Sequence, residues 1–252
     1  SLLVLTNYSI IKNVILLLYK WKYKKHYENL LRNSNYVILL SNNYKKELSF
    51  FVPNYDKNKV MAIPNPCSFS TSLDLDNKQR EILYVGRIDT YQKKVDLLLK
   101  MWHKLYLQFP EWSLKIVGGG DELITIKEMS RKLGLDRISF EGFKDPTNAY
   151  QTASIFCMTS AFEGFPMVLP EAMQNGVVPV IFDSYLSAKD LIVDGESGFL
   201  IKPFDLDDYC FKIRLLINDH ELRYKMAKTA FFKAQEFSIS NIGAVWLTLL
   251  KL

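Results

Sequence analysis

Apolar and polar positions alternate along the chain with two different periods. Short apolar runs bounded by Gly, Pro, Asn or Asp are typical of buried strands. Between them lie longer segments in which apolar residues recur every three or four positions, as in a helix packed against a sheet. The clearest such segment, residues 94–109, carries one apolar face: Val95, Leu98, Leu99, Trp102, Leu105, Tyr106 and Phe109. Because the two patterns alternate almost throughout, the sequence predicts an α/β fold with a mostly parallel sheet covered on both faces.

Strands are predicted at the following residues: 2–5, 36–40, 59–63, 82–85, 113–117, 138–140, 155–158, 178–182 and 198–201. The helices with the clearest patterns are predicted at these residues: 10–32, 44–51, 94–109 and 167–175. The last of these tolerates Pro170 in its first turns and ends at Gly176, a residue suited to a helix terminus.

A polar stretch divides the chain into two parts. Residues 67–80 carry no apolar period and follow Pro64-Asn65-Pro66, so a linker is expected there. Residues 81–237 are predicted to form a complete Rossmann-like, doubly wound domain. Residues 1–66 would form only a partial Rossmann-like domain, because such a domain typically needs about 100 residues or more.

Composition narrows the class of protein. Of the 252 residues, 48% are hydrophobic and 23% are charged, as in an ordinary soluble globular protein. Cys67, Cys157 and Cys210 are widely spaced and indicate a reduced, cytoplasmic chain without disulfides or a zinc site. Residues 1–6 carry no charged leader, so no signal peptide is expected, and the apolar run 14–19 is too short to span a bilayer. The net charge of +5 mildly favours anionic partners.

Metal and nucleic-acid binding are not favoured. The three histidines have no partners at metal-ligand spacing. The two D-x-D sequences, 74–76 and 205–207, are interpreted as linker and as a helix start capped by Asp205, so neither a metal nor another cofactor is predicted. No array of basic and aromatic residues indicates a nucleic-acid partner.

Ligands of open α/β sheets bind outside the carboxyl ends of the strands. Arg87 and Lys93 follow the strand at 82–85 and suit a diphosphate, Arg87 as a planar fork and Lys93 as a point charge. A basic loop exposed to solvent would look the same. Three glycines, 118–120, follow the next strand and let a ligand approach the backbone. Glu141-Gly142-Phe143 follows the third.

The loop after residues 155–158 is the most informative segment, Glu163-Gly164-Phe165-Pro166-Met167-Val168-Leu169-Pro170-Glu171. Its glycine and prolines indicate a tight, exposed loop that leads into a helix. Glu163 and Glu171 are therefore expected to lie close together at one rim of the fold. A carboxylate accepts hydrogen bonds from two neighbouring hydroxyls, so this pair suits a sugar nucleotide.

From Glu81 to the C-terminus the chain resembles the retaining glycosyltransferases of family 4, which have the GT-B fold. The resemblance rests on the order and spacing of six segments: Gly86-Arg87 with Lys93, Val117-Gly118-Gly119-Gly120-Asp121, Glu141-Gly142-Phe143, E-x7-E from Glu163 to Glu171, Asn175-Gly176, and residues 193–200. Upstream, residues 41–48 and 63–66 look like the end of the family's N-terminal domain. Residues 238–252 look like its final helix, which crosses back to that domain.

The resemblance implies a hexosyltransferase-type enzyme of polysaccharide biosynthesis. Such an enzyme transfers a sugar from a nucleotide-diphosphate donor to a glycan or lipid-linked acceptor with retention of configuration. Arg87, Lys93 and Glu163 would be catalytic; the two cations would hold the diphosphate in place of a metal, and Glu163 would contact the transferred sugar. Glu171 would accept from the ribose hydroxyls, the main chain at Phe143 would meet the base, and backbone N–H groups of residues 164–167 would lie nearby. The donor-binding set is thus Gly86, Gly119, Phe143, Gly164, Phe165, Pro166, Met167 and Glu171.

Two positions depart from the family pattern. A histidine often follows the first strand, where this chain has Thr6-Asn7, and a glycine commonly follows the lysine, where this chain has Lys94. The partial N-terminal domain leaves two alternatives open. The chain could be a non-catalytic sugar-nucleotide-binding module that needs a partner chain, or a sugar-nucleotide epimerase.

The basic helix at residues 10–32 also has two interpretations. Its cations are Lys20, Lys22, Lys24, Lys25 and Arg32, and its apolar face carries Ile11, Val14, Leu18 and Trp21. A solvated helix face is favoured, because the N-terminal domain must cover its own sheet. The alternative is a peripheral contact with the inner face of an anionic membrane.

Overall fold

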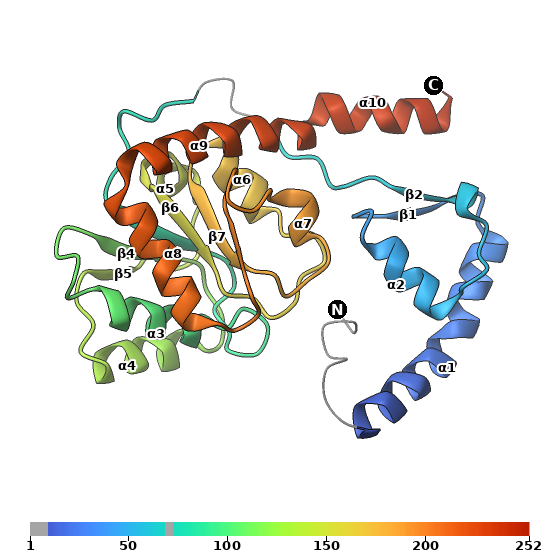
Figure 1. Ribbon diagram of the computed structural model, residues 1–252, viewed down its shortest axis with the longest axis horizontal. Coiled ribbons are helices and arrows are strands. Elements are labelled where there is room, and N and C mark those ends of the chain that lie inside the picture. Colours follow the sequence, from blue (N-terminus) through green and yellow to red (C-terminus); the bar gives the residue numbers. More distant parts are fainter. Residues whose placement is uncertain (1–9, 69–72, 252) are drawn as a thin grey trace.

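The computed structural model of the protein describes residues 10–68 and 73–251. In this part of the chain the main sheet has six strands, all paired in parallel in the order β5-β4-β3-β6-β7-β8 (Figure 1). In chain order they are β3 (Glu81–Val85), β4 (Ser113–Val117), β5 (Ile138–Phe140), β6 (Ile155–Met158), β7 (Val178–Phe182) and β8 (Phe199–Ile201). The predicted α/β fold with a parallel sheet is confirmed.

Helices cover both faces of this sheet because successive side chains of each strand point to opposite sides. Ile82 and Tyr84 of β3 belong to one hydrophobic cluster, and Leu83 belongs to another. The first cluster includes residues of α3 (Val95–Leu105), α4 (Leu123–Lys132) and α8 (Leu206–Asn218). The second includes residues of α5 (Thr147–Thr152), α6 (Val168–Gln174) and α7 (Ala188–Leu191), and α9 (His220–Ala234) contributes to both. The sheet is therefore doubly wound.

A smaller group of elements precedes the main sheet, and we call residues 10–62 the N-terminal unit. It contains α1 (Ile10–Asn33), β1 (Val37–Leu39), α2 (Tyr44–Phe51), the 3-10 helix η2 (Lys57–Lys59) and β2 (Val60–Ala62). β1 and β2 pair in parallel, and the unit has a hydrophobic cluster of its own, which includes Leu48, Phe51 and Val60. Figure 1 shows this unit beside the main sheet. The domain boundaries placed at residues 66, 80 and 237 stay predictions.

The chain returns toward the N-terminal unit at its end. After η3 (Gln235–Phe237), α10 (Ile239–Leu250) continues away from α9 on the side of the N-terminal unit (Figure 1). The backbone N–H of Cys67 donates to the carbonyl oxygen of Phe237 at 2.7 Å. The segment that enters the main domain therefore contacts the segment that leaves it.

The apolar face assigned to α1 from the sequence is wrong where the structure describes its side chains. Leu18 and Trp21 are 62% and 81% exposed. Tyr23, Tyr27 and Leu31 pack instead into the cluster of the N-terminal unit, which also includes residues of α2, β1 and β2. The strand predicted at residues 2–5, with Thr6-Asn7, lies outside the described residues. None of the described helices is long and apolar enough to cross a membrane.

Candidate functional site

The parallel sheet brings the carboxyl ends of its strands to one edge, and the candidate residues follow those ends. Gly86 follows β3, Gly118 follows β4, and Glu141 follows β5. Backbone hydrogen bonds join these loops, from Gly86 N to Val117 O at 3.0 Å and from Gly118 N to Gly142 O at 2.8 Å. The loops predicted at the strand ends therefore form one continuous edge of the fold.

The glycine turn after β4 is required by a close approach of two backbones. Gly118 has a φ of +148°, and a Cβ atom built on it would lie 1.8 Å from the carbonyl oxygen of Gly86. Ile88 N donates to Gly119 O at 2.8 Å beside this contact. The loops after β3 and β4 can pack this closely only because position 118 lacks a side chain.

Two of the predicted catalytic residues are in direct contact. Lys93 Nζ lies 2.6 Å from Glu163 Oε1, and the two side chains are only 18% and 8% exposed. The residues are 70 positions apart and lie on the loops after β3 and β6. Solvent screens such a largely buried pair much less than a surface pair, so this contact joins the two loops.

Lys93, and not its neighbour Lys94, forms this ion pair in the described chain. Lys94 lies at the start of α3 in the left-handed conformation, with φ 52° and ψ 43°. Glycine adopts this conformation without strain, which explains why a glycine suits the position. Thr159 Oγ1 lies 2.9 Å and 3.0 Å from the carbonyl oxygens of the two lysines and so supports the bend.

Arg87 is connected to this pair through the side chain of Gln92. Arg87 Nη2 donates to Gln92 Oε1 at 2.9 Å, and Gln92 Nε2 lies 3.3 Å from Glu163 Oε2. Arg87 Nε pairs with Asp89 Oδ2 at 2.9 Å, yet 61% of the arginine side chain is exposed. A guanidinium has five N–H donors, so Arg87 can bind a phosphate without losing these contacts.

Gln92 was not identified from the sequence, although it joins the two central loops. Besides the contacts to Arg87 and Glu163, its Nε2 donates to the carbonyl oxygen of Phe162 at 3.1 Å. Its own carbonyl oxygen accepts from Ala161 N at 2.7 Å. A polar residue in a loop looks like a solvated one in sequence, and no spacing rule links position 92 to position 163.

Asp89 shapes the loop that carries Lys93, and it too was not identified from the sequence. Its Oδ1 accepts from Gln92 N at 2.6 Å and from Lys93 N at 3.1 Å. Burial raises the pKa of the Asp89 carboxyl, but these two N–H donors and Arg87 outweigh burial and lower the pKa overall. Asp89 is therefore an ionised acceptor around which the loop turns.

Glu171 lies outside the network of Arg87, Gln92, Lys93 and Glu163. Its Oε2 accepts from the hydroxyl of Tyr150 on α5 at 2.9 Å. Burial, and then the charge of Glu171, raise the pKa of Tyr150 and keep its phenol protonated as a donor. Within the described residues, Glu163 and Glu171 share no hydrogen-bond partner. The structure thus joins three of the four charged residues emphasised by the sequence.

The loop at residues 164–167 is anchored by packing. Phe165 is buried, and its ring meets that of Phe237 edge-on, with centroids 5.6 Å apart. Pro166 is buried as well. The expectation of backbone N–H donors along the whole loop is wrong at Pro166, because proline has no N–H. The other three residues of the loop keep theirs.

Exposed aromatic rings lie along the same loops. Phe143 is 94% exposed, and a Cβ atom on Gly119 would lie 3.5 Å from its Cβ. The main chain at Phe143 therefore lies beside the glycine turn. Tyr91 and Phe162, from the loops after β3 and β6, meet edge-on with centroids 5.6 Å apart. An exposed aromatic pair offers apolar surface with a polar tip to a ligand.

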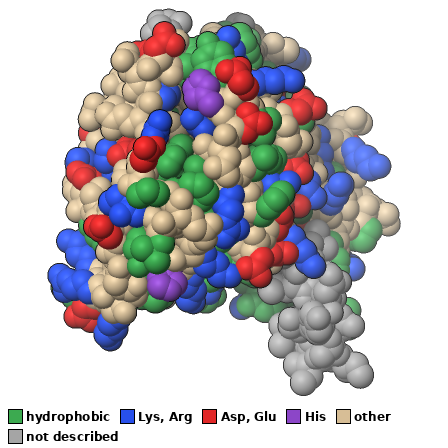
Figure 2. Space-filling view, turned by 60° about the vertical axis from the view of Figure 1, so that its left-hand side comes forward, with side chains coloured by type: hydrophobic (Ala, Val, Ile, Leu, Met, Phe, Trp, Pro, Cys, Tyr) green, Lys and Arg blue, Asp and Glu red, His purple; other side chains and the backbone are tan. Residues whose placement is uncertain are grey.

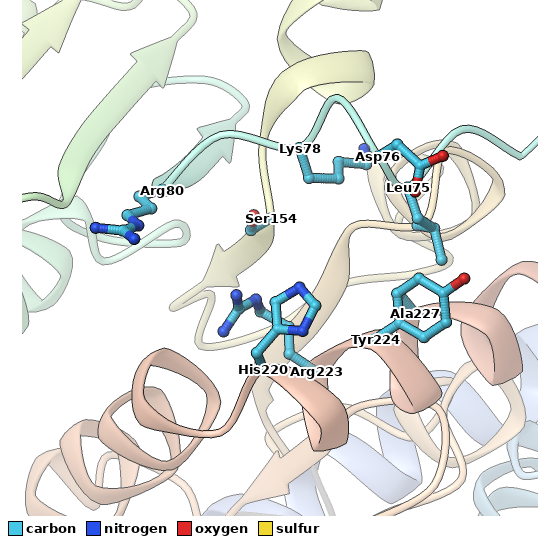
Figure 3. A pocket seen from close by; sticks show the side chains of 10 residues that line it. Leu75, Asp76, Lys78, Arg80, Ser154, His220, Arg223, Tyr224 and Ala227 are labelled. Carbon is cyan, nitrogen blue, oxygen red and sulfur yellow. The ribbon is translucent and has the colours of Figure 1, made fainter.

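A cavity of about 370 Å³ lies at the opposite edge of the sheet, before the amino ends of β3 and β6 (Figure 3). Side chains that line it include the following: Lys78, Arg80, Ser154, His220, Arg223 and Tyr224. Lys78 Nζ donates to Tyr150 O at 2.9 Å, and Ser154 Oγ donates to Gln79 O at 2.5 Å. None of the predicted site residues lines this cavity.

Neither a basic stripe on the face shown in Figure 2 nor a cluster of possible metal ligands among the described residues indicates a further binding site. Figure 2 shows basic and acidic side chains interspersed on one face, rather than a continuous basic stripe. In residues 10–68 and 73–251, no group of three or more His, Cys, Asp or Glu residues is placed to hold a metal ion. The expectation that the site needs no metal or other cofactor stays a prediction.

Comparison with known proteins identifies glycosyltransferases that are similar to this chain in sequence. Residues 68–231 match the family model described as glycosyl transferases group 1. The chain is 32% identical over 205 residues to an uncharacterized glycosyltransferase of Haemophilus influenzae, an alignment that covers 79% of this chain and 57% of the relative. It is 29% identical over 196 residues, covering 76% of this chain and 54% of the relative, to a Campylobacter jejuni protein. That protein is named GalNAc-alpha-(1->4)-GalNAc-alpha-(1->3)-diNAcBac-PP-undecaprenol alpha-1,4-N-acetyl-D-galactosaminyltransferase.

The fold is similar to that of TarM of S. aureus, solved in complex with fondaparinux, alpha-GlcNAc-glycerol and UDP. The TM-score is 0.79 at 24% identity, with 90% of this chain and 46% of TarM covered. The structural neighbours have the GT-B fold. The chain spans about half the length of the curated relatives that it matches.

Proposed function

The chain belongs to the glycosyl transferases group 1, and on this premise we propose that it binds a nucleotide-diphosphate sugar and acts in transfer of a hexose with retention. The observation that carries the proposal is the contact between Lys93 and Glu163, extended through Gln92 to Arg87, at the carboxyl edge of the sheet. Because the chain covers about half of its relatives, the proposal concerns the donor side of the reaction.

Arg87 and Lys93 would bind the diphosphate. In the transfer, the bond between the anomeric carbon and the diphosphate oxygen breaks, and its electron pair stays on the diphosphate. The acceptor hydroxyl would form the new bond to the anomeric carbon on the face that the diphosphate leaves, and its proton would pass to the departing diphosphate oxygen. Two fixed cations stabilise the charge that develops on the leaving group, in the role that a metal has elsewhere. The transition state would resemble an oxocarbenium ion.

The two carboxylates would accept hydrogen bonds from hydroxyl groups of the donor. Glu163 is held at both oxygens, by Lys93 and Gln92, and would accept from hydroxyls of the transferred sugar. Glu171, positioned by Tyr150, would accept from the ribose. The main chain at Phe143, beside the glycine turn, would meet the base, and the backbone N–H groups of the loop at 164–167 would lie near the sugar.

The acceptor would be a glycan or a lipid-linked glycan. The name of the Campylobacter relative contains an undecaprenol-linked acceptor, which supports the lipid-linked class. Exposed apolar residues of α1, Leu18 and Trp21, lie near exposed cations such as Lys22 and Lys25. A helix of this composition can lie on an anionic membrane. We therefore propose a peripheral contact with the inner face of the membrane, in a cytoplasmic protein.

Substitution of Lys93 tests the donor site. Lys93→Ala should weaken binding of a nucleoside diphosphate by about 10- to 100-fold, because hydrogen bonds to charged groups contribute about 1.5–3 kcal/mol. The measurement is calorimetric titration with UDP, GDP and ADP, each compared with its bare nucleoside. Binding of the nucleoside should be nearly unchanged, since it lacks the diphosphate.

Lys94→Gly is the matched control, because it removes a neighbouring cation at a position whose conformation glycine adopts freely. It should leave diphosphate affinity within about twofold, a difference below 0.5 kcal/mol. Two results would show that Lys93 does not bind the diphosphate. One is an equal loss of diphosphate affinity in both variants, and the other is an equal loss of affinity for the nucleoside and the nucleoside diphosphate. Binding should persist in EDTA; a chelator-sensitive affinity would contradict the metal-free assignment.

The two alternatives have distinct outcomes with a panel of UDP-, GDP- and ADP-sugars. Acceptor-dependent release of the nucleoside diphosphate supports the transferase. Saturable binding without turnover favours a binding module. Conversion of the donor's own sugar in the absence of acceptor favours an epimerase.

A further inference from the structure

The N-terminal unit contacts the main domain through the turn after β1. Asp190, on α7, accepts hydrogen bonds from three successive residues of this turn. They come from Ser41 Oγ, from Asn42 N at 3.0 Å and from Asn43 Nδ2 at 2.7 Å. Ser41 is buried, so this carboxylate fixes the turn to α7 in a partly desolvated contact.

Tyr44, the next residue, reaches the candidate donor site. Its hydroxyl lies 2.9 Å from the carbonyl oxygen of Glu163 and 2.6 Å from that of Gly164. Ser187 Oγ donates to the same Gly164 oxygen at 2.7 Å. Burial raises the pKa of Tyr44, with smaller contributions from nearby carboxylates, so its phenol stays protonated as a donor.

These contacts restrain the backbone of the loop at its glycine, Gly164. Gly164 is exposed, and a Cβ built on it would meet nothing within 4 Å, so packing does not fix its backbone. The Glu163 side chain is fixed by Lys93 and Gln92, and its carbonyl side by Tyr44. The side chain and the carbonyl group of Glu163 are thus positioned before any ligand arrives. This lowers the entropic cost of ordering the loop when a ligand binds.

We propose that Tyr44 is a positioning residue through which the N-terminal unit holds the backbone of Glu163 and Gly164 in the conformation that receives the transferred sugar. Asp190 fixes the turn that presents Tyr44. The inference rests on the proposed function of the site. It goes further in making recognition of the sugar, and not of the nucleotide, depend on a residue of the N-terminal unit.

The test compares Tyr44→Phe, which removes one hydroxyl, with Tyr36→Phe, a half-exposed tyrosine of the same unit. Calorimetric titration uses the tightest-binding sugar nucleotide of the panel and its nucleoside diphosphate. Tyr44→Phe should weaken the sugar nucleotide by about 3- to 10-fold, the effect of one hydrogen bond, and leave the nucleoside diphosphate unchanged. Tyr36→Phe should change neither. An unchanged sugar-nucleotide affinity, or equal losses for both ligands, would overturn the proposal.

A second readout needs no ligand. Amide hydrogen exchange at residues 163–165, 167 and 168 should be faster in Tyr44→Phe than in the unmodified protein, because the hydroxyl no longer restrains the loop. Tyr36→Phe should exchange like the unmodified protein. Unchanged exchange in Tyr44→Phe would overturn the positioning role. If no sugar nucleotide binds the unmodified protein, the proposed function fails, while this exchange comparison still decides whether Tyr44 restrains the loop.

Discussion

At the scale of single residues, Glu163 is held by three other side chains, two at its carboxylate and one at its main-chain carbonyl. Lys93 contacts one of its oxygens, Gln92 lies beside the other, and Tyr44 contacts its carbonyl oxygen. A functional group held from several sides keeps its geometry without help from the ligand. In the proposed site, specificity would therefore depend on supporting residues as well as on those that contact the donor.

Gly118 gives a prediction about stability at this scale. Gly118→Ala should destabilise the protein by at least about 2 kcal/mol, because the new methyl group would overlap the backbone oxygen of Gly86. The measurement is urea denaturation, with Gly134→Ala as the control. Gly134 also has positive φ, at +63°, but a Cβ atom at this position would meet nothing within 4 Å. Its substitution should cost only about 1 kcal/mol, and equal losses in the two variants would contradict the close-approach argument.

Some of these residues could be identified from sequence and others could not. Lys93 and Glu163 follow apolar strands that are easily recognised, and parallel strands place their carboxyl ends together. Gln92 and Asp89 lie in the same loop as Lys93, but their roles depend on contacts to backbone groups and to residue 163, which no local pattern encodes. Tyr44 lies on a different unit, and its contact depends on how the two sheets are placed.

At the scale of elements, the loop between β3 and α3 is a turn built around one ionised carboxylate. The Asp89 pKa is lowered in the folded protein by the N–H groups of Lys93 and Gln92 and by Arg87, which outweigh burial. A lowered folded-state pKa means that the carboxylate stabilises the fold at any pH above the pKa of Asp in the unfolded chain, about 3.9. That stabilisation is lost as the pH falls through the folded-state pKa.

Asp89→Asn should therefore lower the free energy of unfolding at pH 7, and the difference from the unmodified protein should shrink below about pH 4. Denaturation curves at pH 7 and pH 3 measure both differences. Asp121→Asn, at an exposed position after β4, is the control and should change little at either pH. A difference for Asp89→Asn that stays constant between the two pH values would show that its charge does not stabilise the loop.

The strands of the main sheet were predicted well from the sequence, whereas the buried face of α1 was predicted wrongly. A buried strand such as β6, which lies between Ser154 and Thr159, is bounded by polar residues, so its limits are visible in the sequence. In α1, the residues that pack are Tyr23, Tyr27 and Leu31, and the rings of both tyrosines contact that of Phe51 on α2. Which apolar face a helix buries depends on its neighbour in space, and no pattern in the sequence identified α2 as the neighbour of α1.

At the scale of the whole molecule, cationic side chains lie at both edges of the main sheet. The carboxyl edge carries Arg87 and Lys93 beside Glu163. The amino edge carries the cavity of Figure 3, with Arg80 and Arg223 in its lining. The general rule for parallel sheets favours the carboxyl edge. The N-terminal unit also contacts that edge, through Tyr44.

A crystal structure of the protein with a bound sugar nucleotide tests this assignment most directly. We predict that the diphosphate lies within hydrogen-bond distance of the Arg87 guanidinium and the Lys93 ammonium, with the sugar against Glu163. A diphosphate bound instead between Arg80 and Arg223, with Lys93 still paired to Glu163 and no ligand near them, would contradict it.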